Sequence, residues 1–217
     1  MRKIAAVAAA VLCGACVFGG CGGETFVAES YICESGTVTE LRITAENRAV
    51  NVGVSEDDKI RVDYFNGEKE YFDISVSGGV LKVELLSDKT WTDYIGVKPD
   101  ARYRKIDVLL PEGAINRIFI TTTNEEIAVE SLSVTEEIVL DDNGGDIFFG
   151  LLSAGNGIRL TAKNGSIGGT VAGGWDDFAI TCSVKKGKSN LPARKEDGDK
   201  LLAVECNNGD VSIDFKA

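Results

Sequence analysis

The sequence predicts an all-β protein, a single-domain parallel β-solenoid with a hairpin-containing N-terminal half. This is a β-helix-like stack of rungs of about 20–22 residues each. Three observations predict it: apolar and polar residues alternate with the period of two that marks half-buried strands, a strand-turn-strand motif recurs at nearly constant spacing, and no segment has a helical pattern of credible length. A rung of this length cannot bury its apolar face alone, so stacking of rungs must form the core.

The repeat is clearest in two similar segments, residues 41–47 (LRITAEN) and 158–164 (IRLTAKN). In each, alternation is followed by an Asn that opens a turn, and alternation resumes at Val50 and at Ile167. Asn and Gly are the residues that tight turns with positive φ favour. Each segment therefore predicts two short strands joined at a corner.

Aligning the C-terminal half on that corner gives a register for the rungs. The corner positions are separated by 20, 20, 22 and 22 residues, and they are Glu125, Gly145, Gly165, Gly187 and Gly209. The positions five residues earlier are Ile120, Leu140, Leu160, Cys182 and Val204. We expect Gly165 and Gly209 to have positive φ. A β-sandwich also uses short alternating strands, but the nearly constant period favours the solenoid.

The N-terminal half is less regular but also reads as strands. Residues 60–64 and 106–110 alternate, and residues 72–76 and 80–85 flank Ser77-Gly78-Gly79, which predicts a β-hairpin. Between these strands lies an aromatic segment, residues 89–96. No Pro/Ser-rich linker interrupts the chain, which supports one domain.

The N-terminus predicts export and lipid anchorage. Arg2 and Lys3 precede an apolar run, residues 4–18, that is shorter than the about 20 residues of a membrane-spanning helix. The sequence Phe18-Gly19-Gly20-Cys21 then resembles the lipobox of bacterial lipoproteins, in which the cysteine is acylated and the peptide before it is removed. Cys16 is an alternative acylation site, and cleavage of an ordinary signal peptide is a second alternative.

This interpretation divides the chain into a lipoprotein signal peptide (1–20), a lipidated N-terminal tether (21–37) and a β-strand-repeat domain (38–217). Lipid on Cys21 would hold an exported protein on the extracytoplasmic side of a membrane, since two or more acyl chains anchor stably. The chain has a net charge of −11 and no histidine. Nucleic acid is therefore not expected as a partner, because binding it requires clustered cations.

Several segments resemble a known family. They are residues 57–64, 71–76, 91–96, 106–113, 184–192 and 206–215. Together they are similar to a bacterial domain-of-unknown-function family called putative adhesins, which is built of β-strand repeats and found on exported proteins. The resemblance covers most of residues 38–216. It implies a parallel, β-helix-like stack and carries over no catalytic residue. Lys185-Lys186 and two strand cysteines depart from the family pattern.

Residue types argue against an enzyme, a metal site and a cofactor. Without histidine, neither a Ser-His-Asp triad nor a Cys-His pair can form, and no phosphate-binding glycine loop is present. The acidic stretch 141–146 suggests calcium at first, but Asp146 and Leu152 occupy positions where an EF-hand loop needs Gly and Glu. We therefore expect a non-catalytic protein, with a tight turn at 141–146.

The weak candidates for ligand contact are the aromatic residues Trp175, Trp91 and Tyr94, which could stack on sugars. The alternative for each is packing over an open end of the stack. An envelope protein or a glycan is the expected class of partner. Two other functions stay open: an enzyme acting on polysaccharide, for which residues 185–195 supply the basic cluster, and a scaffold for another envelope protein.

The cysteines Cys182 and Cys206 occupy inward strand positions, offset by two residues. With rungs about 4.8 Å apart and about 6.6 Å between residues i and i+2, their Cα atoms should lie roughly 8 Å apart. That exceeds the reach of a disulfide. We expect two free thiols, with Cys206 against Val184 and Cys182 against both Leu160 and Val204.

Overall fold

The computed structural model describes residues 10–12, 17–19, 25–95 and 98–217. Within these residues the chain consists of strands and short 3-10 helices, and no α-helix occurs, so the predicted all-β class is confirmed. The 3-10 helices are η1 (Ser35–Thr37), η2 (Trp91–Tyr94), η3 (Ala101–Tyr103) and η4 (Trp175–Asp177). No helix in the described ranges is long and apolar enough to cross a bilayer.

The described strands form two sheets. The first contains β1 (Ala10–Leu12), β2 (Val17–Gly19), β3 (Thr25–Glu34), β6 (Lys59–Asn66), β9 (Lys105–Leu110), β5 (Ala49–Val54), β11 (Ile127–Val134), β13 (Ile147–Ala154), β15 (Ile167–Ala172) and β19 (Val211–Lys216). The second contains β17 (Arg194–Lys195), β16 (Phe178–Lys186), β18 (Lys200–Asn208), β14 (Gly157–Ala162), β12 (Glu137–Asp142), β10 (Arg117–Thr123), β4 (Glu40–Glu46), β8 (Val80–Ser87) and β7 (Glu70–Ser77).

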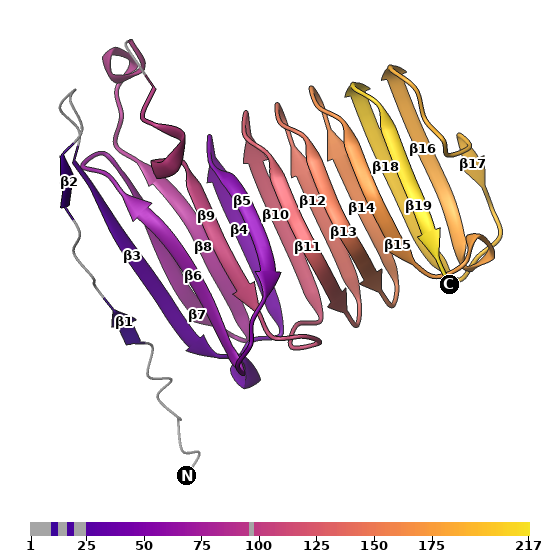
Figure 1. The fold of residues 1–217 in the computed structure, drawn as a ribbon, viewed down its shortest axis with the longest axis horizontal. Coiled ribbons are helices and arrows are strands. Elements are labelled where there is room, and N and C mark those ends of the chain that lie inside the picture. The colour runs from indigo at the N-terminus through magenta and orange to yellow at the C-terminus, as the bar shows by residue number, and fades with distance from the viewer. Residues whose placement is uncertain (1–9, 13–16, 20–24, 96–97) are drawn as a thin grey trace.

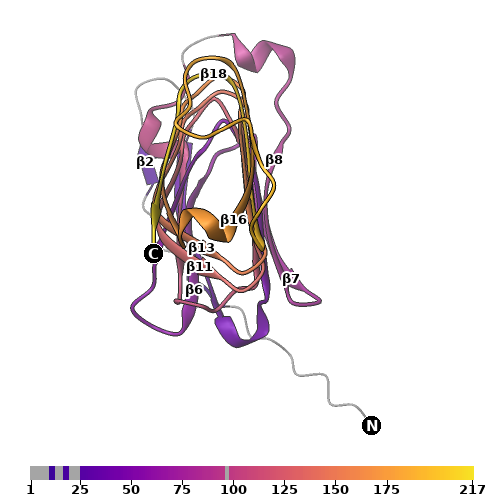
Figure 2. The same ribbon diagram turned by 90° about the vertical axis from the view of Figure 1, so that its right-hand side faces the viewer.

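The two sheets lie face to face as flattened layers with the core between them (Figures 1 and 2). Both are mixed: the middle strands pair in parallel, whereas antiparallel pairs such as β3–β6, β7–β8 and β16–β17 lie toward the ends. Along each strand alternate side chains point inward, and inward residues such as Ile43, Ile120 and Leu140 are almost completely buried. Burial of these alternating apolar side chains is the main contribution to stability.

The strand pairing confirms the register expected from the repeat. Ile120 pairs with Leu140, Leu140 with Leu160 and Leu160 with Val204, and Val204 also pairs with Cys182. The strands after the corners align in the same way, through Ile127, Ile147, Ile167 and Val211. Each of these two sets therefore forms one inward row through the stack.

The order of the strands in space departs from their order in the sequence. The β4–β5 pair lies between β8–β9 and β10–β11, and the β18–β19 pair lies between β14–β15 and β16. The expected contact of Cys182 with Leu160 is therefore wrong, because β18 separates them, whereas the pairings of Cys182 with Val204 and of Cys206 with Val184 are confirmed. Between β16 and β18 the chain adds to the first sheet only an isolated bridge, from Ser189 to Val211.

The predicted hairpin is confirmed. Strands β7 and β8 are antiparallel, Ser77 pairs with Val80, and the two residues between them have φ values of 59° at Gly78 and 82° at Gly79. Positive φ at both central residues is the geometry of the two-residue turn that matches the twist of a hairpin.

The corner glycines differ from the expectation. Positive φ was expected at Gly165 and Gly209, but among the described residues the left-handed positions at the corners are Asn47 (φ 55°), Asn124 (φ 61°) and Gly187 (φ 148°). Gly165 and Gly209 are required for another reason, namely close stacking. A Cβ on Gly165 would lie 1.9 Å from the carbonyl oxygen of Gly145, and one on Gly209 would lie 2.2 Å from that of Gly165.

The expected tether also differs in part. Residues 25–34 form β3, which pairs along its length with β6 and buries Tyr31 and Cys33. The short strands β1 and β2 pair with the other edge of β3. The described cysteines, Cys33, Cys182 and Cys206, are buried free thiols.

Candidate functional site

The structure separates the aromatic residues that the sequence offered as ligand contacts. Trp175 lies in η4 at the C-terminal end of the stack, where its ring meets that of Phe215 edge-on with centroids 5.3 Å apart. Its side chain is 42% exposed. Because Phe178 also contacts Phe215, Trp175 is part of a small aromatic cluster that covers this end of the core.

Trp91 lies at the other end of the molecule, in η2 of the loop between β8 and β9 (Figure 1). It is 76% exposed, so it does not pack over the stack. The backbone of Tyr94 belongs to the same 3-10 turn, while its side chain lies outside the described part of the structure. Cys21, the expected acylation site, also lies outside the described residues.

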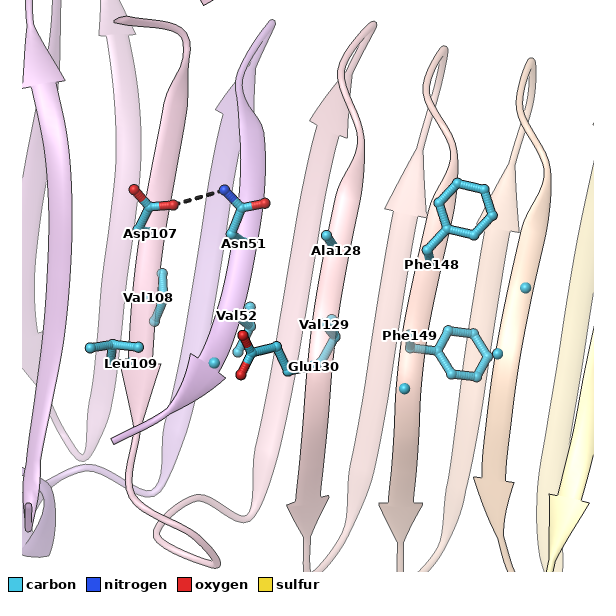
Figure 3. Close-up of a pocket in the computed structure, with 14 residues that line it drawn as sticks. Asn51, Val52, Asp107, Val108, Leu109, Ala128, Val129, Glu130, Phe148 and Phe149 are labelled. Carbon is cyan, nitrogen blue, oxygen red and sulfur yellow. Dashed lines mark hydrogen bonds between the residues drawn. The ribbon is translucent and has the colours of Figure 1, made fainter. Parts of the chain in front are cut away.

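A groove that the sequence did not suggest crosses the outer face of the first sheet. It runs over β9, β5, β11, β13 and β15 and has a volume of about 660 Å³ (Figure 3). Its outward-facing lining consists of Asn51, Gly53, Asp107, Leu109, Ala128, Glu130, Phe148, Gly150 and Gly168. Residues from five strands therefore contribute to one shallow, open surface.

The groove exists because small residues occupy neighbouring outward positions. Ala128 pairs with Phe148, and Phe148 pairs with Gly168, so the Phe148 side chain has no large neighbour on either side. A Cβ on Gly168 would lie 3.5 Å from Cδ1 of Phe148, which shows that the ring lies over β15. Phe148 is 45% exposed. The floor of the groove is thus close to the backbone, and an aromatic ring borders it.

Polar groups border the opposite side of the groove. Asn51 donates from Nδ2 to Oδ1 of Asp107 at 2.8 Å, as Figure 3 shows, and Lys105 binds the other carboxylate oxygen at 2.6 Å. The Glu130 carboxylate lies near Gly53. An apolar ring beside amide and carboxylate groups can contact a flat or extended ligand that carries hydroxyl or amide groups.

The acidic turn at 141–146 has a structural role. Asp142 is completely buried, and its Oδ1 accepts hydrogen bonds from the backbone N–H groups of Gly144 (2.8 Å) and Gly145 (2.9 Å). Burial raises the pKa of Asp142, and the neighbouring Asp141 and Asp146 raise it further, against the lowering effect of these two hydrogen bonds. In the described part of the chain, no group of three or more Cys, Asp or Glu side chains could hold a metal ion.

Some residues of the basic cluster at 185–195 are exposed to solvent, and others contact the C-terminal end of the stack. Lys195 donates to the backbone carbonyl of Phe178 at 2.8 Å, and Arg194 forms an exposed ion pair with Glu196. Its residues do not converge on the groove, which lies over other strands. The basic cluster therefore lies apart from the groove.

Comparison with known proteins gives a family-level match. The model of the family described as Toastrack DUF4097 matches residues 38–216. No curated protein matches the sequence.

One solved structure shares the fold at low sequence identity, and a second is more distant. The crystal structure of a "putative cell adhesion protein" from Clostridium sporogenes is 14% identical with a TM-score of 0.57, covering 88% of this chain and all of that one. A "putative adhesin" from Parabacteroides merdae is 11% identical with a TM-score of 0.36, covering 89% and 82% of the two chains. At these identities the first match shows a common fold.

Proposed function

The chain belongs to the Toastrack DUF4097 family, and we propose that it is a non-catalytic, lipid-anchored protein of the cell envelope that binds a partner through the groove on its outer face. The groove is the main support for this proposal, because it combines a half-exposed aromatic ring with hydrogen-bonding groups on one sheet face. The adhesion named for the protein from Clostridium sporogenes is compatible with a surface-binding role.

The architecture in this proposal is a parallel solenoid that serves as a rigid support. The inward rows from Ile120 to Val204, and the parallel pairing of β10, β12, β14 and β18, support it. Residues on rigid strands keep their relative positions better than residues on loops. A solenoid would therefore hold Phe148 and Asn51 at a fixed separation for recognition.

The groove chemistry favours a glycan of the envelope as the partner. Sugars present apolar faces that stack on aromatic rings and hydroxyl groups that hydrogen-bond to carboxylates and amides. Phe148 supplies the ring, and Asn51, Asp107 and Glu130 supply the polar groups. A scaffold would need a flat apolar interface. The exposed large apolar side chains of the described residues do not form one, because they lie on several different elements. They are Val54, Tyr71, Trp91, Ile95, Phe148 and Trp175.

Site-specific photo-crosslinking in living cells tests this function. A photoreactive amino acid in place of Ala128 samples the groove, and the same residue in place of Ala203, an outward position on the opposite sheet, is the matched control. We expect adducts only from position 128, sensitive to periodate, which cleaves the vicinal diols of sugars. Phe148→Ala should abolish them.

Phe119→Ala provides a second control, because Phe119 is an outward aromatic residue on the opposite sheet, where it lies under the Arg42 guanidinium at 4.4 Å. It should leave the adducts unchanged. Equal crosslinking from positions 128 and 203 would contradict the groove as the binding face. Adducts that resist periodate and digest to foreign peptides would show a protein partner in place of a glycan.

A further inference from the structure

The loop between β8 and β9, residues 88–104, presents two large apolar side chains to solvent near one another in sequence. Trp91 is 76% exposed and Ile95 is 70% exposed, the two largest values among the exposed large apolar residues of the described chain. Single exposed apolar residues are common on protein surfaces. Two on one projecting loop present apolar side chains that the described core does not use.

The loop is held in place by buried and charged contacts. At its first end, the Glu70 carboxylate accepts hydrogen bonds from Arg48 at 2.9 Å and from Lys89 at 2.7 Å, and all three side chains are largely buried. Next to Trp91, the Asp93 carboxylate accepts a hydrogen bond from the backbone N–H of Thr90 at 2.8 Å. These contacts therefore hold the turn in a conformation that leaves the Trp91 side chain exposed to solvent.

The base of this loop contacts the start of the folded chain. The ring of Tyr103, at the second end of the loop, stacks on that of Phe26 with centroids 4.5 Å apart and an angle of 11° between the planes. Phe26 is the second residue of β3, and Thr25 lies four positions after Cys21. Because each residue spans at most about 3.6 Å, the four residues from position 21 to Thr25 can span at most about 14 Å.

An acyl chain on Cys21 would therefore bring the bilayer to the end of the molecule from which this loop projects (Figure 1). Helix η4, which contains Trp175 and directly precedes β16, lies at the opposite end of the stack (Figure 1). The charge of the loop also suits an approach to headgroups. Residues 88–104 contain four basic and three acidic residues, a net charge of +1, whereas the whole chain carries −11.

We propose that Trp91 and Ile95 insert into the interfacial region of the bilayer that holds the lipid on Cys21, as a second membrane contact. The inference rests on the proposed lipid anchorage. Tryptophan favours the headgroup region, where its apolar ring is buried and its N–H stays hydrated. Two attachments fix an orientation that one flexible anchor does not. The ends of the strands face the membrane, and the groove on the outer sheet face points sideways, free to bind.

Fluorescence of single-tryptophan variants tests the inference, because the chain contains 2 Trp residues. The mature lipidated protein is reconstituted into vesicles of phosphatidylethanolamine and phosphatidylglycerol whose acyl chains are brominated close to the headgroup. Trp175→Phe leaves Trp91 as the reporter, and Trp91→Phe is the matched control. We expect bromine to reduce Trp91 emission severalfold and to leave Trp175 emission unchanged. Adding Ile95→Ser should weaken the quenching of Trp91.

Fatty-acid labelling of the same samples separates the two proposals. A labelled protein whose Trp91 is not quenched would overturn the inference and leave the anchorage standing. Equal quenching of both tryptophans would overturn it as well, because the domain would then have no fixed orientation. Blue-shifted Trp91 emission without quenching would show that this side chain packs against protein, and it would overturn the inference too. Absence of label would overturn the anchorage, and the inference with it.

Discussion

Asp142 shows how a position in the stacked core can require a particular residue. At the inward position three residues before each corner, Asp142 stands in the row that also contains Thr122, Ala162 and Cys206. Its Oδ1 caps the turn at Gly144 and Gly145, while its buried Oδ2 has no hydrogen-bond partner. The carboxylate thus replaces an apolar side chain in order to organise the turn, and its charge is unfavourable there.

Asp142→Asn should change how stability depends on pH. The pKa of Asp142 is raised in the folded protein, chiefly by burial, so the folded state holds this proton more tightly than the unfolded state. Its stabilising contribution is therefore present below the unfolded pKa and is lost as pH rises through the folded pKa. Urea unfolding between pH 4 and pH 8 should show the variant gaining stability relative to wild type as pH rises. A constant difference across this range would contradict the assignment.

Gly165→Ala should destabilise the protein although φ at Gly165 is not in the left-handed region. The new Cβ would meet the carbonyl oxygen of Gly145 and push two stacked corners apart. Overpacking of this kind costs about 1–3 kcal/mol. Gly36→Ala is the matched control, since a Cβ on Gly36 has no atom within 4 Å. The free energy of unfolding from denaturant titration measures both, and equal values for the two variants would refute close stacking at the corner.

At the scale of elements, the two ends of the stack are closed by different means. At the C-terminal end, the Asn190 amide donates to the carbonyl of Ile213 at 2.9 Å and accepts from its N–H at 3.0 Å, so one side chain pairs with the edge of β19. At the other end, the β8–β9 loop is fixed through Glu70 and Tyr103. The Asn190 side chain thereby satisfies backbone groups of an edge strand that would otherwise be free to pair with other chains.

Glu70→Gln should loosen the β8–β9 loop and lower stability. Burial acts to raise the pKa of Glu70, but hydrogen bonds from Lys89 and Arg48 outweigh it, and the pKa lies below its usual value. The stabilisation is thus present above the unfolded pKa and lost as pH falls through the folded pKa. Removing the charge leaves two buried cations without their partner, at a cost of about 3 kcal/mol near neutral pH.

The comparison variant is Glu84→Gln, whose partner Lys82 is half exposed, and which should change stability by less than about 1 kcal/mol. Hydrogen exchange of residues 88–95 should accelerate in Glu70→Gln alone. If both variants unfold at the same denaturant concentration, the buried cluster does not hold the loop.

Strand positions and register could be predicted from sequence, but the order of the strands could not. Alternation and the spacing of corners depend on local sequence, so the pairing of Ile120, Leu140 and Leu160 followed from them. The placement of β18 between β14 and β16 depends on which pair can continue both sheets, which is a property of the whole stack. β3 was missed because its exposed and buried residues alternate irregularly.

The groove could not be predicted because it depends on neighbours across strands. Ala128, Phe148 and Gly168 lie 20 residues apart in sequence, and each is ordinary in its own strand. They form a surface only once the register is known, since Phe148 is exposed because its two neighbours are small. The corner glycines show the same limit, because the atom that excludes a Cβ at Gly165 belongs to another rung.

At the scale of the whole molecule, the two proposals place partner binding on one face of the stack and membrane contact at one end of it. The start of β3 and the loop that carries Trp91 lie together through the stacking of Phe26 on Tyr103. The groove lies on the outer sheet face, over β9 to β15. This separation would let the protein bind its partner while it stays attached.

Lipid on Cys21 is the claim on which the localisation and the orientation both depend. Metabolic labelling with a radioactive fatty acid tests it directly in cells that express the wild-type chain, Cys21→Ala or Cys16→Ala. We expect label on the wild type and on Cys16→Ala, and none on Cys21→Ala, which should leave the membrane fraction. Label that survives in Cys21→Ala and disappears in Cys16→Ala would move the anchor to Cys16, and absence of label from all three proteins would show that the protein has no lipid anchor.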